Sequence, residues 1–503
     1  MTQGSHETQK TQEAHEAQLT HETQLTHEAQ EAGAIGKAGA GPAAALLTRR
    51  KLGLLVICAA QFLVALDLSI ANIAMPQMTA ELGFAPHSAG LVLSTFALAF
   101  AAMLLLGGRI ADLYGRRRVF VASLLVLGAA SVLAGAAWNP AALLTGRVLQ
   151  GLAAGFIAPS ALGLLTATIP EGPARERALG IFGAIMSAGF VSGMVGGGVL
   201  TEFLNWRWTM YINVPVVIVA VALAVRFLPE SRVQGNRRLD ILGCLLSAGA
   251  MICLVHGLEE LGADTAWTST ALIFALGVGL VLAFLRVERR SPNPVLPLSL
   301  FGIRAVGGAN AIGLLMVAAY GGMLLILTLY LQEVLDHGAL ATGLVFAVSG
   351  VIGIVNSMLT GRYLRRRRPD QLLLVGIAIA TVGLAALVLL PERNGLWLVI
   401  MATAVNAFGH IIVLVISSIA ANNGVPADHK AVAGAVMNTG QQLGIALGVA
   451  LMTSLAAEVT AAQPDPGSDA ALVTGWRWAM ALAAVLALTT LPIALALRKR
   501  LRV

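Results

Sequence analysis

The residue that most suggests chemistry is Asp67, an acidic side chain inside a long apolar stretch that runs on to Met75 and Pro76. A carboxylate in the hydrocarbon region of a membrane costs about 2.5 to 3.5 kcal/mol on insertion scales, so it needs a partner or a use. A bound proton is one compensation, and a purely structural bond to a neighbouring helix is the alternative. We predict that Asp67 accepts and releases protons on a transport path.

Arg147 is a second charge within an apolar stretch. At 1.5 Å per residue, Asp67 lies about 22 Å from the start of its stretch at Leu52, and Arg147 lies about 9 Å from the opposite face at Ala141. In a hydrocarbon core about 30 Å thick, these two depths are similar. Movement of an arginine relative to a carboxylate changes the proton affinity of the carboxylate. The hypothesis is that Asp67 and Arg147 together couple transport to protons.

A short polar connection from Gly108 to Arg118 lies between two apolar stretches. Its glycines permit close approach of the backbone. Its carboxylate can pair with an arginine or cap a helix dipole in one conformation only, as a latch does. Anchoring at the membrane surface explains the arginines alone, but not the glycine and aspartate positions. The predicted conformational gate consists of Gly108, Asp112, Gly115, Arg116 and Arg117.

Glycines recur along the fifth apolar stretch, and such a stripe lets another helix approach closely. Rocking at that contact and static tight packing are both open interpretations. The stripe consists of Gly180, Gly189, Gly193, Gly197 and Gly198.

Polar side chains on other apolar stretches are candidates for the wall of a substrate cavity, and a helix-to-helix hydrogen bond is the equal alternative for each. These candidates are Gln150, Asn406, His410, Asn438 and Gln441. We expect no metal site and no cofactor, with a proton gradient as the source of energy.

The elements that must position these residues are membrane helices. Apolar residues make up 57% of the chain and charged residues 12%, half of what a soluble domain carries. Stretches of about twenty apolar residues predict an all-α membrane protein with fourteen transmembrane helices. They are 52–75, 88–107, 119–137, 141–163, 178–200, 209–228, 239–258, 269–287, 305–331, 339–361, 372–390, 395–420, 432–456 and 478–497.

Lysine and arginine follow every second stretch, which predicts the orientation, because basic residues near helix ends are retained in the cytoplasm. Examples are Arg116 to Arg118, Arg175 and Arg177, Arg289 and Arg290, Arg365 to Arg368, and both tails. The opposite side carries only Arg207, Arg393 and Arg477. Both termini are therefore expected in the cytoplasm, on a multi-pass protein of the cytoplasmic membrane. The net charge of +7 is explained by these clusters and does not indicate a nucleic-acid partner.

The chain repeats itself. Gly108-Arg109 followed by an arginine run recurs as Gly361-Arg362, and Trp206-Arg207-Trp208 recurs as Trp476-Arg477-Trp478. Such duplication is typical of transporters with two rocking bundles. The predicted organisation is a disordered cytoplasmic tail (1–48), an N-terminal six-helix bundle (49–230), two additional helices with their loops (231–300) and a C-terminal six-helix bundle (301–503).

These residues resemble the major facilitator superfamily, in particular its fourteen-helix drug:proton antiporter group. Gly108 to Arg118 is similar to the cytoplasmic signature, and Arg147, Gln150, Gly151 and Gly155 are similar to the fourth-helix signature, whose arginine is associated with proton transfer. Asp67 to Pro76 resembles the first-helix signature of fourteen-helix exporters, and the glycine stripe resembles the antiporter motif. Two positions depart from the pattern. Met194 replaces the motif proline, which weakens the implied antiport, and Arg365 replaces an aspartate in the second copy of the cytoplasmic signature.

The resemblance and the residues together predict proton-coupled efflux of a lipophilic small molecule, such as a drug or antibiotic, by alternating access. We expect a monomer that works with protons and the lipid bilayer. Proton-coupled uptake or symport of a metabolite is the alternative on the same fold. A membrane enzyme would need clustered nucleophiles or ligands, which the sequence does not contain, and a sensor would depend on the histidine-rich tail.

Overall fold

The computed structural model describes residues 40–85, 88–169, 172–232, 241–259, 267–291, 296, 298–425 and 430–498. Residues 55–503 form a compact unit, and the packing described below is that of this unit. The helices are α2 (Ala40–Leu82), α3 (Leu91–Tyr114), α4 (Arg116–Gly135), α5 (Pro140–Thr168), α6 (Pro173–Phe203), α7 (Arg207–Tyr211), α8 (Asn213–Phe227), α9 (Ile241–Glu259), α10 (Trp267–Arg290), α11 (Ser299–Gly302), α12 (Arg304–Leu329), η3 (Tyr330–Val334), α13 (Ala339–Arg366), α14 (Pro369–Ala386), η4 (Leu387–Leu389), α15 (Leu396–Asn422), α16 (Lys430–Ala461) and α17 (Asp469–Leu497).

Among the described residues, twelve helices are long and apolar enough to cross a membrane. A thirteenth is added if the two parts of α3, Leu91–Leu104 and Leu106–Tyr114, form one span with a bend of 50°. Helix α9 contains only the shorter apolar segment Leu245–Leu254. Each of the fourteen predicted stretches thus lies on a helix, but length and apolarity do not establish fourteen spans.

The sequence explains how several of these helices begin and end. Helix α5 begins after Asn139, whose side chain accepts a hydrogen bond from Ala142 N at 2.8 Å, and Pro140 occupies the first turn. Gly115 separates α3 from α4 with φ of +107°, a conformation that side chains with a Cβ rarely adopt. These local signals place the ends of the helices that carry the candidate residues.

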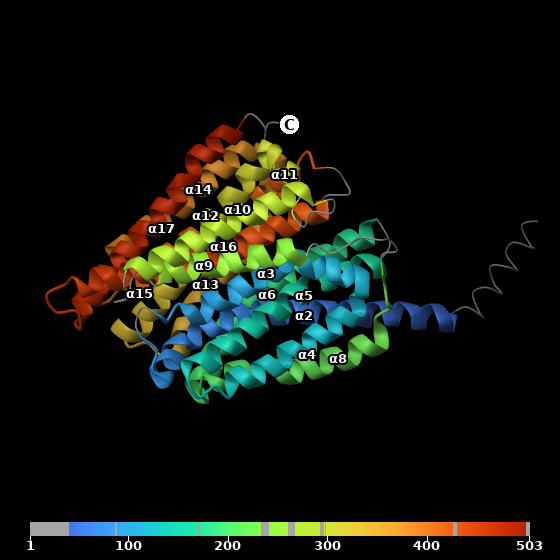
Figure 1. Cartoon of the computed structure of the whole chain (residues 1–503), viewed down its shortest axis with the longest axis horizontal. Coiled ribbons are helices and arrows are strands. Elements are labelled where there is room, and N and C mark those ends of the chain that lie inside the picture. Colours follow the sequence, from blue (N-terminus) through green and yellow to red (C-terminus); the bar gives the residue numbers. More distant parts are fainter. Residues whose placement is uncertain are drawn as a thin grey trace, which may run out of the picture. The chain divides into compact units, whose positions relative to one another are not determined.

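The N-terminal helices α3–α8 and the C-terminal helices α12–α17 each pack among themselves, and α2 packs against α6 and α5 of the N-terminal group. Contacts of α3 with α16 and of α6 with α13 join the two groups. Helices α4 and α8 lie side by side in the first group (Figure 1). Between the groups in sequence, α9 and α10 form a pair, and α9 packs against both α3 and α16 (Figure 1). Helix α9 therefore lies at the seam where α3 and α16 meet, and α10 packs on α9.

The two Trp-Arg-Trp sequences occupy matching places in the two groups. Arg207 donates to the carbonyl of Ala137, just after α4, at 3.0 Å. Arg477 donates to the carbonyl of Leu390, just after α14 and η4, at 2.8 Å. In both, the first tryptophan is buried and the second is exposed. The repeated residues thus make the same contact at the end of the third helix of each group, as a basic side chain at a helix C-terminus is expected to do.

Tryptophan and arginine mark opposite ends of the helices. Exposed tryptophans lie at the end that we call the tryptophan end: Trp138 just after α4, Trp208 in α7, Trp397 in the first turn of α15 and Trp478 within α17, next to the Arg477 that contacts Leu390. The other end, which we call the basic end, carries Arg116 to Arg118, Arg365 to Arg368 and Arg498. Tryptophan is enriched at membrane interfaces, so the exposed rings are consistent with a membrane boundary at the tryptophan end.

The predicted tail lies mostly outside the described residues, which begin at Ala40 with α2, inside the range predicted as disordered. Its histidines and the basic residues beyond Arg498 are also outside the described part of the chain.

Candidate transport site

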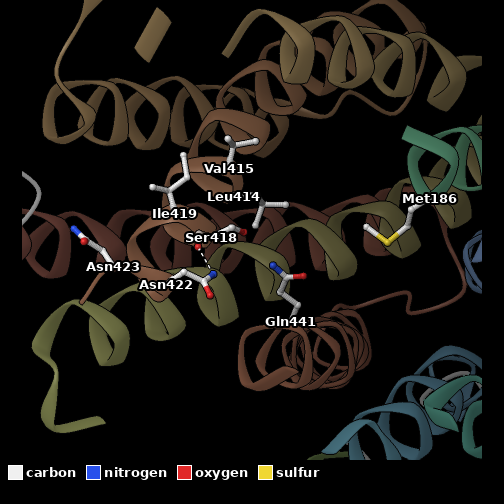
Figure 2. Close-up of a pocket in the computed structure, with 8 residues that line it drawn as sticks. All are labelled: Met186, Leu414, Val415, Ser418, Ile419, Asn422, Asn423 and Gln441. Atoms are coloured by element: carbon white, nitrogen blue, oxygen red, sulfur yellow. Dashed lines mark hydrogen bonds between the residues drawn. The ribbon is translucent and has the colours of Figure 1, made fainter. Parts of the chain in front are cut away.

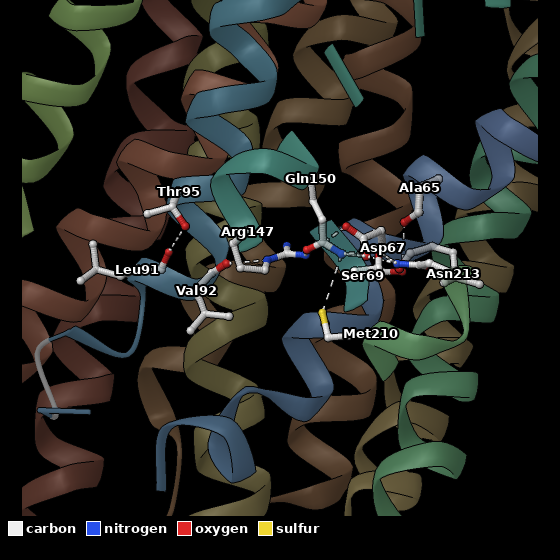
Figure 3. Close-up of polar contacts among 12 residues, drawn as sticks. Ala65, Asp67, Ser69, Leu91, Val92, Thr95, Arg147, Gln150, Met210 and Asn213 are labelled. Carbon is white, nitrogen blue, oxygen red and sulfur yellow. Dashed lines mark hydrogen bonds and ion pairs between the residues drawn. The ribbon is translucent and has the colours of Figure 1, made fainter. Parts of the chain in front are cut away.

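Asp67 and Arg147 form an ion pair in the interior of the N-terminal helices (Figure 3). Arg147 Nη1, from α5, lies 3.0 Å from Asp67 Oδ2, on α2, and both side chains are 0% exposed. Depth along the helices predicted that the two could meet, and the fold brings them into direct contact. The functional role of the pair stays a prediction.

Arg147 is held by groups other than the carboxylate. Its Nε donates to the carbonyl of Val92 at 3.0 Å, and its guanidinium lies 4.4 Å from the centre of the Phe96 ring. Its Nη1 also donates to Gln150 Oε1, one turn further along α5, at 3.0 Å. The cation is therefore desolvated and held by a carboxylate, two oxygens and an aromatic face, while its Nη2 has no hydrogen-bond partner among the described residues.

Three further polar side chains complete the cluster around Asp67. Gln150 Nε2 and Asn213 Nδ2 donate to Asp67 Oδ1 at 3.1 and 2.6 Å, and both also contact Ser131 Oγ. Gln150 was predicted to line a substrate cavity, whereas the structure places it in this buried cluster. Asn213 and Ser131 were not predicted; the signal that could have pointed to them is that each is a polar residue inside an apolar stretch.

The predicted gate residues join three helices at the basic end. Arg116 Nε lies 2.8 Å from Asp112 Oδ1, and its Nη1 donates to the carbonyl of Gly163 on α5 at 2.9 Å. Asp112 therefore pairs with an arginine of the same connection, as one state of a latch would require. Gly108 has room for a side chain, since a Cβ there would have Pro159 Cβ at 3.5 Å.

Glu230, which follows α8, is the partner that sequence analysis missed. Its Oε1 accepts from the backbone N of Arg117 at 3.2 Å, at the first turn of α4, and its Oε2 lies 3.7 to 3.8 Å from the side chains of Arg117 and Arg118. A carboxylate at a helix N-terminus is favourable. The φ of +107° explains glycine at position 115, and a Cβ there would also lie 2.6 Å from Glu230 Oε1.

The C-terminal group has the equivalent joint with the charges exchanged. There the acid is Asp370 in the first turn of α14, and it lies 3.2 Å from Arg498 at the end of α17. In both groups an ion pair thus ties the start of the third helix to the end of the sixth. This second ion pair does not include Arg365, the residue that replaces an aspartate in the second copy of the cytoplasmic signature.

The predicted glycine stripe of α6 divides into three parts. Gly189, Gly193 and Gly197 face α2, where a Cβ would lie 2.6 Å from Phe62 O, 2.7 Å from Leu66 O and 3.0 Å from Ile70 O, respectively. A Cβ on Gly198 would lie 2.7 Å from Ala339 O of α13, in the other group. Gly180 has nothing within 4 Å of such a Cβ. Helix α6 is therefore packed closely against the turns of α2 that flank Asp67.

A central cavity of about 240 Å³ lies between the two groups. Residues of α2 and α6 line one side, and residues of α12, α13, α15 and α16 line the other. Three of the predicted cavity residues are there: His410, Asn438 and Gln441. Asn406 is not among the lining residues; its Nδ2 donates to the carbonyl of Ala380 at 3.1 Å, a bond between α15 and α14.

A wider vestibule of about 860 Å³ adjoins the cavity (Figure 2). The two spaces share Met186, Leu414 and Gln441, and the vestibule continues along α15 to Asn422 and Asn423 at the basic end. In Figure 2, Met186 of α6 faces this space from the side opposite Asn423. The central cavity therefore leads toward the basic end.

The two groups are joined by hydrogen bonds near the tryptophan end. Thr328 Oγ1 donates to Asn72 Oδ1 at 2.6 Å, and Gln332 Nε2 donates to the carbonyl of Ile73 at 3.0 Å. Both contacts lie on the turn of α2 just beyond Asp67. A cavity that leads to one end and is closed by contacts near the other has the geometry expected of one state of an alternating-access transporter.

Comparison with known proteins identifies the family to which this chain belongs. The sequence profile of the Major Facilitator Superfamily matches residues 57–449. The chain belongs to this family. Members of the family are transporters and not, in general, enzymes. The match includes Asp67, Arg147 and the gate, and it ends within α16.

Named relatives are antibiotic resistance and export proteins. The chain is 39% identical to the puromycin resistance protein pur8 of Streptomyces alboniger, over 85% of this chain and 86% of the relative. It is 36% identical to the cephamycin export protein CmcT of Amycolatopsis lactamdurans, over 82% of this chain and 86% of the relative.

Solved structures share the fold at low identity. A peptide transporter POT crystallised with sulfate has a TM-score of 0.67 and 15% identity, and the match covers 90% of this chain and 95% of that one. A bacterial homologue of the human lysosomal transporter Spinster, in an inward-facing conformation, has a TM-score of 0.64 and 16% identity over 90% of this chain and 98% of that one. These likenesses establish the fold.

Proposed function

We propose that this protein exports antibiotic-like small molecules from the cytoplasm in exchange for protons. The relatives are named for resistance to, or export of, puromycin, cephamycin, methylenomycin and lincomycin, which supports export as the direction of transport. The observation that carries proton coupling is the Asp67–Arg147 pair, because a fully buried carboxylate in a membrane span is a functional site by default.

The coupling route runs through α2. One face of this helix carries Asp67 into the buried cluster, and another presents Gln61, Val64 and Leu68 to the central cavity. Its next turn makes the contacts with Thr328 and Gln332 that join the two groups. When Asp67 takes up a proton, its attraction to Arg147 is lost, and α2 is freed to shift against α6 and α12. Proton binding thus favours one of the two states, and substrate binding in the cavity favours the other.

We further propose that α9 and the bent α3 both cross the membrane, giving fourteen spans. With an even number, both termini and the basic end lie in the cytoplasm, as the arginine clusters favour. The exposed tryptophans among the described residues lie at the other end and are consistent with a membrane boundary there. In this orientation the vestibule opens to the cytoplasm, the side from which an exporter takes its substrate. The 49–230, 231–300 and 301–503 segments then act as two rocking bundles and a linking pair.

The test is the reconstituted protein in proteoliposomes with an internal pH probe, preloaded with a proton gradient. Addition of puromycin, a cephamycin or lincomycin should release protons only when the protein is present. Uptake by symport predicts proton movement in the same direction as the substrate, and this result would reverse the proposal. Movement of these compounds without any proton movement would leave export and remove antiport.

A further inference from the structure

Two aromatic rings form a stacked pair on the wall of the central cavity. Tyr320, on α12, and His410, on α15, have ring centres 4.5 Å apart and planes inclined by 22°. Both residues line the cavity. Stacked rings of this kind can extend to a third planar ring, and such contacts contribute beyond the area they bury.

Buried polar atoms on both sides of the same cavity have no hydrogen-bond partner among the described residues. They are His410 Nδ1, Gln61 Oε1 and Gln442 Oε1. The three side chains are only 4 to 8% exposed, and they come from α15, α2 and α16. Buried polar groups are almost always bonded, so these side chains require a bonding partner that a bound molecule can supply. Because Gln61 belongs to the N-terminal group, that molecule would touch both groups.

Charge restricts the bound molecule further. Among the described residues that line the cavity and the vestibule, none is aspartate, glutamate, lysine or arginine. The nearest buried carboxylate, Asp67, is occupied by Arg147, Gln150 and Asn213. A charge that enters an apolar site without a counter-ion is strongly disfavoured. The site therefore fits a molecule whose bound part is uncharged.

We propose that Tyr320 and His410 form a ring-binding platform that makes this transporter selective for molecules whose bound part is uncharged and carries a planar aromatic ring with a hydrogen-bonding edge. The ring stacks on the platform in the central cavity of about 240 Å³, and the edge bonds to Gln61 and Gln442. The remainder of a larger substrate lies in the vestibule of about 860 Å³. This inference rests on the proposed export function and names the class of molecule exported.

The test compares two compounds in the full-length protein in membrane vesicles: puromycin, which has aromatic rings, and lincomycin, which has none. Tyr320→Leu and His410→Leu remove a ring but keep most of the apolar volume. We expect each to lower puromycin export about fivefold to tenfold, with lincomycin export changed by less than about twofold. Tyr320→Phe, which restores the ring, should recover puromycin export. Phe203→Leu, at an exposed ring outside the cavity, is the matched control.

Two results would contradict the platform. Equal loss of both compounds in Tyr320→Leu, with Tyr320→Phe no better, would make the pair a structural contact only. Unchanged puromycin export in both leucine variants would place the ring elsewhere. The melting temperature of each purified variant identifies export that is weaker because of poor folding. For such a variant, calorimetry of puromycin binding to the folded fraction tests whether the platform binds the ring. Failure of the wild-type protein to export either compound would instead overturn the export function itself.

Discussion

The buried ion pair offers the sharpest experiment, because its two charges can be removed separately or together. In the structure Asp67 Oδ2 meets Arg147 Nη1 at 3.0 Å, and Oδ1 accepts from Gln150 and Asn213. Asp67→Asn replaces one oxygen by an NH₂ group, so that at least one of these donors would face another donor. Arg147 would be left charged, 0% exposed and without its counter-ion.

The magnitude follows from that burial. Removal of one partner of a buried pair costs about 3 to 5 kcal/mol, whereas removal of both is close to neutral. We therefore expect Asp67→Asn to lower the melting temperature of the purified protein clearly. The double variant Asp67→Asn with Arg147→Gln should recover most of that loss. Arg147→Gln alone should also be destabilising, because it leaves the carboxylate unpaired.

Transport assays separate a loss of stability from a loss of proton coupling. In proteoliposomes, both Asp67→Asn and the double variant should lose substrate-driven proton movement, although the double variant is stable. Exchange of substrate without a proton gradient should persist in the double variant, since the cavity does not include Asp67. Full proton coupling in Asp67→Asn would refute the carrier role. A double variant no more stable than Asp67→Asn would show that the two charges are not coupled in energy.

Three further outcomes are expected from other parts of the structure. Gly193→Ala should impair transport in vesicles, because its Cβ would lie 2.7 Å from Leu66 O on the turn of α2 that carries Asp67. Gly180→Ala is the matched control, because nothing lies within 4 Å of its Cβ. Equal transport rates in the two variants would show that the α6–α2 contact is unimportant. Gly115→Ala should destabilise the protein by about 1 to 3 kcal/mol, because the backbone has φ of +107° and the added methyl group would contact Glu230. Gly434→Ala is the control and should leave the melting temperature unchanged, since no atom lies within 4 Å of its Cβ. An equally small change in the melting temperature of Gly115→Ala would count against backbone strain at this glycine. Asn72→Cys combined with Thr328→Cys should allow a disulfide that stops transport until a reductant is added, because these side chains join the two groups at 2.6 Å; transport that continues with the bond formed would contradict alternating access.

The positions of the helices and of their ends show how much of the fold the local sequence predicts. The predicted connection at Gly115 and the fourteen apolar stretches correspond to helices or helix ends, because these depend on the local backbone and on nearby residues. The predicted count of fourteen spans is less secure, since α3 is bent and α9 is apolar over only a short segment. Whether such a helix crosses a membrane depends on its neighbours and on lipid, which the apolar pattern does not contain.

The candidate site divides in the same way. Asp67 and Arg147 could be identified from the sequence, because an isolated charge in a long apolar stretch is costly wherever the helix packs. Their similar depth followed from the rise of the helix. Asn213, Ser131 and Glu230 could not be assigned, because an amide, a hydroxyl or a surface acid is unremarkable until its neighbours are known. Gln150 was assigned to the cavity for the same reason, since one helix face cannot be told from another without the packing.

The sequence by itself therefore determined that this chain is a membrane transporter, where its charges lie along the helices, and which residues repeat between its two parts. Composition, isolated charges and repeated motifs are properties of the amino-acid sequence and do not depend on how the chain folds. Only the tertiary structure decided that Arg147 meets Asp67, that Gly189, Gly193 and Gly197 face α2, and that Tyr320 stacks on His410 beside the cavity. The physical reason is that each of these contacts joins helices far apart in sequence, and the rotation of each helix about its own axis is set by packing against all its neighbours at once.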